Sequence, residues 1–228
     1  MPVRFSRAAA HLAHLALMGA LAALALPAHA ADLAVRVLDK HGQPLADAVV
    51  MVQSTLPAGA VTPMLEATIQ QQKMRFKPYV TVVHAGARVS FTNLDAWDHH
   101  VILGPVGPGG FYLDPGQNQQ LRLAGKVGDT LARETRSVTQ TGAYLLGCHL
   151  HGSMRGHLYV ADTPWARVSE ADGQARFTAL PAGPARVRIW HPDQVLDTAP
   201  ITLDVAAGGA AVTVNTQVAP VRRRQAGA

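Results

Sequence analysis

The sequence contains little cysteine, little charge and few aromatic residues. Cys148 is the single cysteine in 228 residues, and charged and aromatic residues make up 15% and 5% of the chain. One cysteine cannot form an internal disulfide, which excludes a disulfide-stapled fold. Arg4, Arg7 and the three arginines at 222–224 carry most of the formal charge of +5, and no basic stretch is interleaved with aromatics. Nucleic acid is therefore not an expected partner.

Long hydrophobic runs are also scarce, because only the N-terminus has one. Residues 8–26 are rich in Ala and Leu, follow Arg4 and Arg7, and lead to the small residues around Ala28 and Ala30. This pattern is typical of a Sec signal peptide over residues 1–30, with cleavage before Ala31. No second such run follows, so we expect a mature chain without a membrane span, exported to a bacterial periplasm.

A long amphipathic helix is absent as well, and the rest of the chain has strand patterns. In the first part we expect strands at residues 33–38 and 48–52, followed by a Pro/Gly/Ala-rich linker at 57–63. The middle part has strand patterns at residues 79–83, 88–92, 141–146 and 157–160. Residues 104–116 are rich in Gly and Pro and should form a loop, whereas 131–139 fits a strand or a short helical turn.

The last part continues the β pattern. Asp172-Gly173 lies between strand-like residues 167–169 and 175–178, which predicts a tight hairpin. Further strands are expected at residues 186–190, 201–205 and 211–215, and a disordered tail at 218–228. The three tryptophans, Trp97, Trp165 and Trp190, are expected in the core.

Cys148 requires an explanation, because a free thiol in an oxidising compartment is oxidised or cross-linked unless it is buried or used. Two residues separate it from His151, and two more separate His151 from Met154. Such a loop can wrap a thiolate, an imidazole and a thioether around one ion. Two His, one Cys and a weak axial Met are the ligands of a blue-copper electron-transfer site. The second imidazole must come from elsewhere, and His99 and His100 are both available.

Two other interpretations of Cys148 are a buried inert thiol and a Cys–His nucleophile. Both leave Met154 without a role, and no Asn/Asp partner motif accompanies a nucleophile. Because successive strand residues point to opposite faces, only one of His99 and His100 can face inward.

The segment around these residues resembles a known family. Residues 74–78, followed by Val80, Val82, Gly86, Val89, Phe91 and Asn93, are similar to the first half of a plastocyanin-type domain. The short ligand loop, with Gly156 after Met154, resembles that of amicyanin. The whole pattern is most similar to cupredoxins of the methylamine-utilisation type, through residues 95–101, 160–164 and 190–192.

This resemblance implies one copper per chain, cycling between Cu(I) and Cu(II). His99 rather than His100 would be its ligand, since one residue and then an apolar one follow it, together with Cys148, His151 and Met154. Asn93 would tie the ligand-bearing loops together, although His149 stands where Ser or Thr is usual. The family implies a single-electron carrier with a redox partner protein, not an enzyme. The alternatives are a copper carrier or storage protein, and a structural module with a vestigial site.

The flanks resemble another family. Residues 42–50 and 170–189 are similar to the two halves of carboxypeptidase-regulatory-like domains, a transthyretin-like β-sandwich. We therefore expect an all-β protein with a Greek-key cupredoxin sandwich over residues 67–162. It should be inserted in, or attached to, a smaller sandwich built from 31–66 (including the linker) and 163–217.

Overall fold

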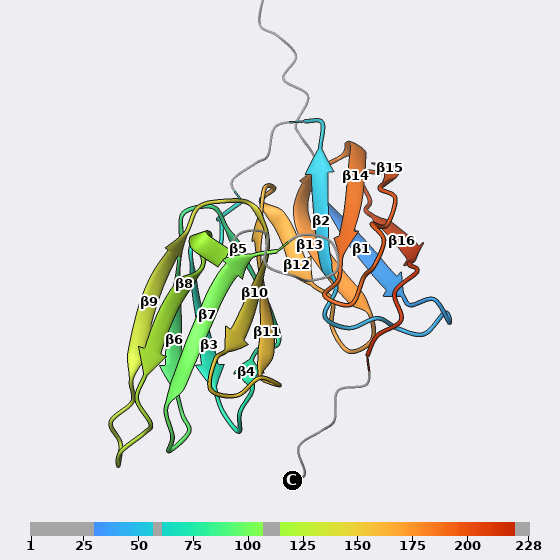
Figure 1. The fold of residues 1–228 in the computed structure, drawn as a ribbon. Helices are drawn as coiled ribbons and strands as arrows, with labels where there is room; N and C mark the ends of the chain where they lie inside the picture. The colour runs from blue at the N-terminus through green and yellow to red at the C-terminus, as the bar shows by residue number, and fades with distance from the viewer. Residues whose placement is uncertain (1–29, 57–60, 107–114, 222–228) are drawn as a thin grey trace, which may run out of the picture.

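The computed structural model describes residues 30–56, 61–106 and 115–221 of the chain. They form two β-sandwiches that lie side by side (Figure 1). The only helical element in these ranges is a three-residue 3-10 turn, η2 (Pro115–Gln117). The all-β prediction is confirmed. Within the same ranges, no helix has the length and hydropathy needed to cross a membrane, and the expected signal peptide lies almost wholly outside them.

The large sandwich is one continuous stretch of chain with two sheets. Its five-stranded sheet has the order β5 (Val80–His84), β11 (Arg155–Ala161), β10 (Gly142–Cys148), β7 (His99–Pro105) and β8 (Gln119–Leu123). Its four-stranded sheet has the order β4 (Phe76–Lys77), β3 (Glu66–Gln71), β6 (Ala87–Asn93) and β9 (Arg133–Val138). Alternate residues of the strands, such as Val101 and Leu103, enter a shared core that also contains Cys148 and Met154.

The small sandwich is built from chain on both sides of the large one. One sheet has the order β13 (Gln174–Pro181), β1 (Ala30–Leu38) and β16 (Ala210–Asn215). The other has the order β12 (Trp165–Val168), β2 (Val49–Ser54), β14 (Gly183–Trp190) and β15 (Ile201–Val205). Thus β1 and β2 pair with strands more than 100 residues later, and all seven strands share one apolar core.

Several local predictions need correction. β12 and β13 do not form the hairpin expected around Asp172-Gly173, because they lie in different sheets and β13 pairs with β1. The turn itself is present, since Gly173 donates its N–H to the Glu170 carbonyl oxygen at 2.9 Å. β7 continues through Pro105, so the Gly/Pro-rich loop starts later than expected; residues 107–114 lie outside the described ranges.

At the C-terminal end, the prediction of a disordered tail over residues 218–228 is wrong at its first residue. Val218 is buried, and its carbonyl oxygen accepts a hydrogen bond from the Lys40 N–H at 2.9 Å. The segment 131–139, which was ambiguous in sequence, contains strand β9 and no helical turn.

A separate apolar cluster packs between the two sandwiches. Val80, Val82 and Ala161 of the large sandwich pack with Val49, Met51 and Ala166 of the small one. The Trp190 ring of β14 lies 5.9 Å from the His157 ring and 5.2 Å from the Tyr159 ring, both on β11. The junction is therefore packed with aromatic and aliphatic side chains.

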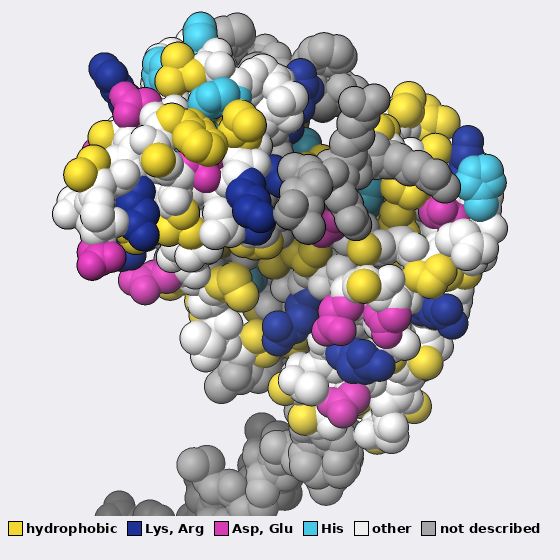
Figure 2. Space-filling model, turned by 90° about the horizontal axis from the view of Figure 1, so that it is seen from below, with side chains coloured by type: hydrophobic (Ala, Val, Ile, Leu, Met, Phe, Trp, Pro, Cys, Tyr) yellow, Lys and Arg dark blue, Asp and Glu magenta, His cyan; other side chains and the backbone are white. Residues whose placement is uncertain are grey.

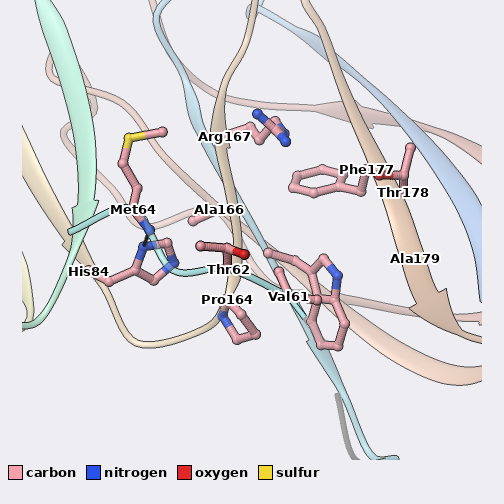
Figure 3. A pocket seen from close by; sticks show the side chains of 11 residues that line it. Val61, Thr62, Met64, His84, Pro164, Ala166, Arg167, Phe177, Thr178 and Ala179 are labelled. Atoms are coloured by element: carbon pink, nitrogen blue, oxygen red, sulfur yellow. Dashed lines mark hydrogen bonds between the residues drawn. The ribbon is translucent and has the colours of Figure 1, made fainter. Parts of the chain in front are cut away.

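Beside this junction lies a pocket of about 310 Å³ (Figure 3). Met64, His84, Trp165, Arg167 and Phe177 are among the residues that line it. His84 is fixed by its surroundings, because its Nδ1 accepts the Met64 N–H at 2.8 Å and its Nε2 lies 2.9 Å from the Thr163 carbonyl oxygen. These two bonds require the neutral tautomer with hydrogen on Nε2, which is a structural role.

Candidate metal centre

Two neighbouring strands place the first two candidate ligands. β7 begins at His99 and β10 ends at Cys148, and the strands run antiparallel with Val101 opposite Cys148. Because side chains alternate along a strand, His99 and Cys148 both point into the sandwich at the same end, the lower end in Figure 1. The chain then turns through residues 149–154 and enters β11.

The donor atoms of three predicted ligands converge. Cys148 Sγ lies 3.6 Å from His99 Nδ1 and 3.5 Å from His151 Nδ1. All three ligand atoms lie within 4.8 Å of one another, and the two imidazole rings are 5.0 Å apart at 64°. Cys148 and His99 are buried, with 5% and 0% of their surface exposed. A soft thiolate with two imidazoles fits a single copper ion.

Met154, the fourth predicted ligand, is held in the same interior. It is 2% exposed and belongs to the core that contains Cys148. Two backbone bonds tighten its loop: His151 donates its N–H to the Cys148 carbonyl oxygen at 3.3 Å, and Met154 donates to the His151 carbonyl oxygen at 2.9 Å. These bonds close the loop, and the Met154 thioether is directed into the interior.

Asp95 is a candidate site residue that the sequence reasoning missed. Its Oδ2 lies 2.9 Å from His99 Nε2, and it is itself 5% exposed. With Nε2–H donated to this carboxylate, the Nδ1 lone pair of His99 faces Cys148. The i,i+4 spacing of Asp95 and His99 was visible in the family pattern, but nothing in the sequence assigned the carboxylate to the ring.

The Asp95 carboxylate is anchored in turn by the β3–β4 connection. Burial by itself raises the pKa of Asp95, but hydrogen bonds from the Met74 N–H, the His99 ring and the Lys73 N–H outweigh it and leave this pKa lowered. Lys73 and Met74 have φ angles of 53° and 54°, and in this left-handed turn both N–H groups reach the carboxylate. Asp95 is therefore ionised at neutral pH.

Asn93 supports the site in a different way from the one expected. Its Nδ2 donates to the carbonyl oxygens of Trp97 at 2.8 Å and Ala124 at 2.9 Å, and its Oδ1 accepts the Asp95 N–H at 2.9 Å. Within the described residues it therefore braces the segment before β7 and the end of β8, not the ligand loop. A backbone bond links the loops instead, from the His149 N–H to the His100 carbonyl oxygen at 2.9 Å.

Gln71 is a second buried polar residue at this end that the sequence did not signal. It pairs with Asn93 across β3 and β6 and is 0% exposed. Neither its Oε1 nor its Nε2 has a hydrogen-bond partner within the described part of the chain. An unpartnered buried amide is destabilising by roughly 1–3 kcal/mol, so its presence beside the candidate site is notable.

Three loops leave large hydrophobic side chains exposed around the site. Met74, Trp97 and Leu150 are 47%, 45% and 57% exposed. The core assignment of Trp97 is therefore wrong, whereas Trp165 is buried and Trp190 half-buried. Seen from below, this end of the large sandwich shows histidine side chains beside hydrophobic ones (Figure 2). We call Met74, Trp97, Leu150 and the half-buried His151 the apolar rim.

Comparison with solved structures finds an auracyanin, an amicyanin and a purple cupredoxin, among others. Auracyanin from Roseiflexus castenholzii is 18% identical over 44% of this chain and 99% of its own, with a TM-score of 0.34. Amicyanin from Paracoccus versutus is 21% identical over 49% and 97%, with a TM-score of 0.31. A purple cupredoxin from Nitrosopumilus maritimus is 18% identical over 42% and 99%, with a TM-score of 0.32. No protein-family model and no curated protein matches the chain.

Proposed function

We propose that this chain is a single-electron carrier that binds one copper through His99, Cys148, His151 and Met154. The observation that carries the proposal is the convergence of a buried thiol and two imidazole nitrogens within 4.8 Å. When bound, copper supplies one-electron redox chemistry between Cu(I) and Cu(II). The protein's part is to hold the donors and exclude water from them.

The placement of the ligands favours electron transfer over catalysis. Cys148 lies on β10, between β11 and β7, and His99 lies on β7, between β10 and β8. Strands paired on both sides can shift little when the charge at the centre changes. A site that resists rearrangement suits an electron carrier, whereas an enzyme needs an open position for its substrate.

Asp95 keeps His99 in the right tautomer. The carboxylate accepts the proton of His99 Nε2 and so directs the Nδ1 lone pair toward Cys148. Its negative charge also favours the more positive Cu(II) state, which lowers the reduction potential. Asp95 is thus a positioning residue, braced by Asn93 and the β3–β4 turn.

The apolar rim is the proposed exit for the electron. His151 is the candidate ligand that is not fully buried, and Met74, Trp97 and Leu150 are exposed hydrophobic residues on the loops of the candidate site. Small, transient contacts are typical of redox partners. We therefore propose that the partner is a redox protein that docks here through apolar contacts, in the periplasm after removal of residues 1–30. N-terminal sequencing that finds Ala31 first would support this export.

The deciding experiment separates an electron carrier from a copper carrier or storage protein. A carrier should give a fast, reversible electrode response and rapid self-exchange, and should hold copper against chelators in both oxidation states. Sluggish voltammetry with ready loss of copper to a chelator would favour the storage or transport alternative. Cys148→Ser serves as the control, because the intense visible band requires the thiolate.

A further inference from the structure

The two strands that carry His99 and Cys148 carry a second histidine pair on their other face. His100 follows His99 on β7, and His149 follows Cys148 at the end of β10. Alternation along the strands turns the first pair inward and the second pair outward. His100 is half-buried and His149 exposed, in contrast to the two buried ligands.

Backbone pairing holds the outer histidines beside each other. His149 donates its N–H to the His100 carbonyl oxygen at 2.9 Å. Their rings are stacked, with centroids 5.7 Å apart and 23° between the planes. The imidazoles of the inner site, His99 and His151, are separated by a comparable 5.0 Å. Small rotations of two side chains, one of them exposed, can direct one nitrogen of each ring to a common ion.

The surroundings leave these rings available to a cation. Within the described residues, no hydrogen bond engages a ring nitrogen of His100 or His149. Arg122 lies opposite His100 across β7 and β8, but its guanidinium is bound to Asp98 at 2.9 Å. That ion pair offsets the positive charge of Arg122, which would otherwise repel a metal ion.

We propose that His100 and His149 form a second, solvent-exposed metal site that binds Cu(II). Imidazole nitrogens suit divalent copper, which binds such donors more tightly than nickel or zinc, and water completes the coordination. The inner thiolate site and the outer histidine site then lie on opposite faces of the same two strands. The outer site needs neither Cys148 nor a bound inner copper, so it does not depend on the electron-carrier proposal.

The test is a Cu(II) titration of the mature protein followed by visible absorption and EPR. The first equivalent should produce the intense visible band of the inner site. The second should add an EPR signal split by nitrogen, without an intense band. His100→Gln and His149→Gln should each weaken the second binding event by at least about tenfold. His41→Gln, which removes an exposed histidine of the small sandwich, should leave it unchanged.

The outcomes are separable. A second equivalent that binds equally well to the His100→Gln/His149→Gln double variant would overturn the site, as would failure of the wild type to bind it. If the visible band is missing but the histidine-dependent EPR signal is present, the outer site stands and the proposed inner function fails. If His149→Gln alters the visible band through its loop, His100→Gln on the strand decides the result.

Discussion

The buried polar groups that make hydrogen bonds are arranged differently in the two sandwiches of this chain. In the small sandwich, such groups tie turns to strands. Ser169 Oγ accepts the Ala48 N–H at 2.9 Å and donates to the Leu45 carbonyl oxygen at 2.7 Å. Asp39 accepts two backbone N–H groups at 2.8 Å each. The bonds of Ser169 and Asp39 are made within the fold, so these two residues contribute to the stability of the small sandwich.

In the large sandwich, several buried polar groups gather at the end that holds the candidate site. Asn93, Asp95 and His99 form a chain of hydrogen bonds that leads to Cys148. Gln71 lies beside this chain of bonds, and neither of its amide atoms has a partner among the residues that the structure describes. Buried polar side chains in a β core therefore indicate a candidate site where several of them converge and some donors or acceptors lack a partner.

The largest expected effects come from truncating the two cores separately. Phe177 of the small sandwich is 2% exposed and Phe91 of the large one 0% exposed, so replacing either by Ala should cost roughly 3–5 kcal/mol of unfolding free energy. We expect Phe91→Ala to lower the temperature at which the copper band is lost. Phe177→Ala should lower the midpoint temperature of an unfolding transition seen by circular dichroism. The copper band should remain in place at that temperature.

Circular dichroism and the absorbance of the copper band, recorded in one thermal scan, measure the two unfolding transitions. A single transition in which Phe177→Ala removes dichroism and colour together would show that the junction cluster makes the sandwiches one cooperative unit.

Part of this architecture could be predicted from the sequence, because it depends on local patterns. Alternating apolar residues indicate most strands, and the Cys148, His151 and Met154 spacing indicates a ligand loop that the fold then closes. Sheet membership could not be predicted from such patterns. The Asp172-Gly173 turn is local, but β13 pairs with β1, which lies about 140 residues earlier in the chain.

The missed parts of the site have the same cause. The link of Asp95 to His99 depends on the β3–β4 turn, whose two N–H groups fix the carboxylate from more than 20 residues away. Trp97 is apolar and suggests a core position, yet it lies on the segment that Asn93 holds at the surface. The contact of Asp95 with the β3–β4 turn and the bond of Asn93 to the Trp97 carbonyl oxygen both leave no periodic signal in the chain.

The next effect concerns the two buried aspartates. Asp95→Asn removes the charge beside His99 and should raise the reduction potential and weaken Cu(II) binding by roughly 10–100-fold. Asp39→Asn is the matched control in the small sandwich and should change neither quantity. Voltammetry and Cu(II) competition titrations measure both. Equal behaviour of the two variants would mean that Asp95 is only a turn residue.

A smaller change in unfolding free energy should follow when a buried polar side chain is removed. In the apoprotein, Gln71→Leu removes an unpartnered buried amide and should raise the unfolding free energy by about 1 kcal/mol. Ser169→Ala breaks two bonds in the small sandwich and should lower it by roughly 1–2 kcal/mol. Urea denaturation of the apoproteins measures both. A Gln71→Leu apoprotein that is less stable than the wild type would contradict the unpartnered state of this amide.

The smallest effect is the response of the junction to alkaline pH. Burial raises the pKa of Tyr159 above its ordinary value of 10.0, and nearby Arg188 opposes this only in part. In the folded protein the neutral phenol is therefore favoured, whereas the unfolded chain releases this proton at about the ordinary value. The free energy of unfolding should be unaffected below pH 10 and should fall as pH rises from there toward the folded pKa of Tyr159.

Tyr144, inside the large sandwich, also has a pKa raised by burial, and its hydroxyl donates to the Gln140 carbonyl oxygen at 3.0 Å. Tyr159→Phe should reduce the alkaline decrease in unfolding free energy for the transition that involves the junction. Tyr144→Phe should reduce this decrease for the transition in which the copper band is lost. Denaturation curves between pH 8 and pH 11 test this assignment, and an unchanged alkaline slope in Tyr159→Phe would rule out a contribution of the junction tyrosine.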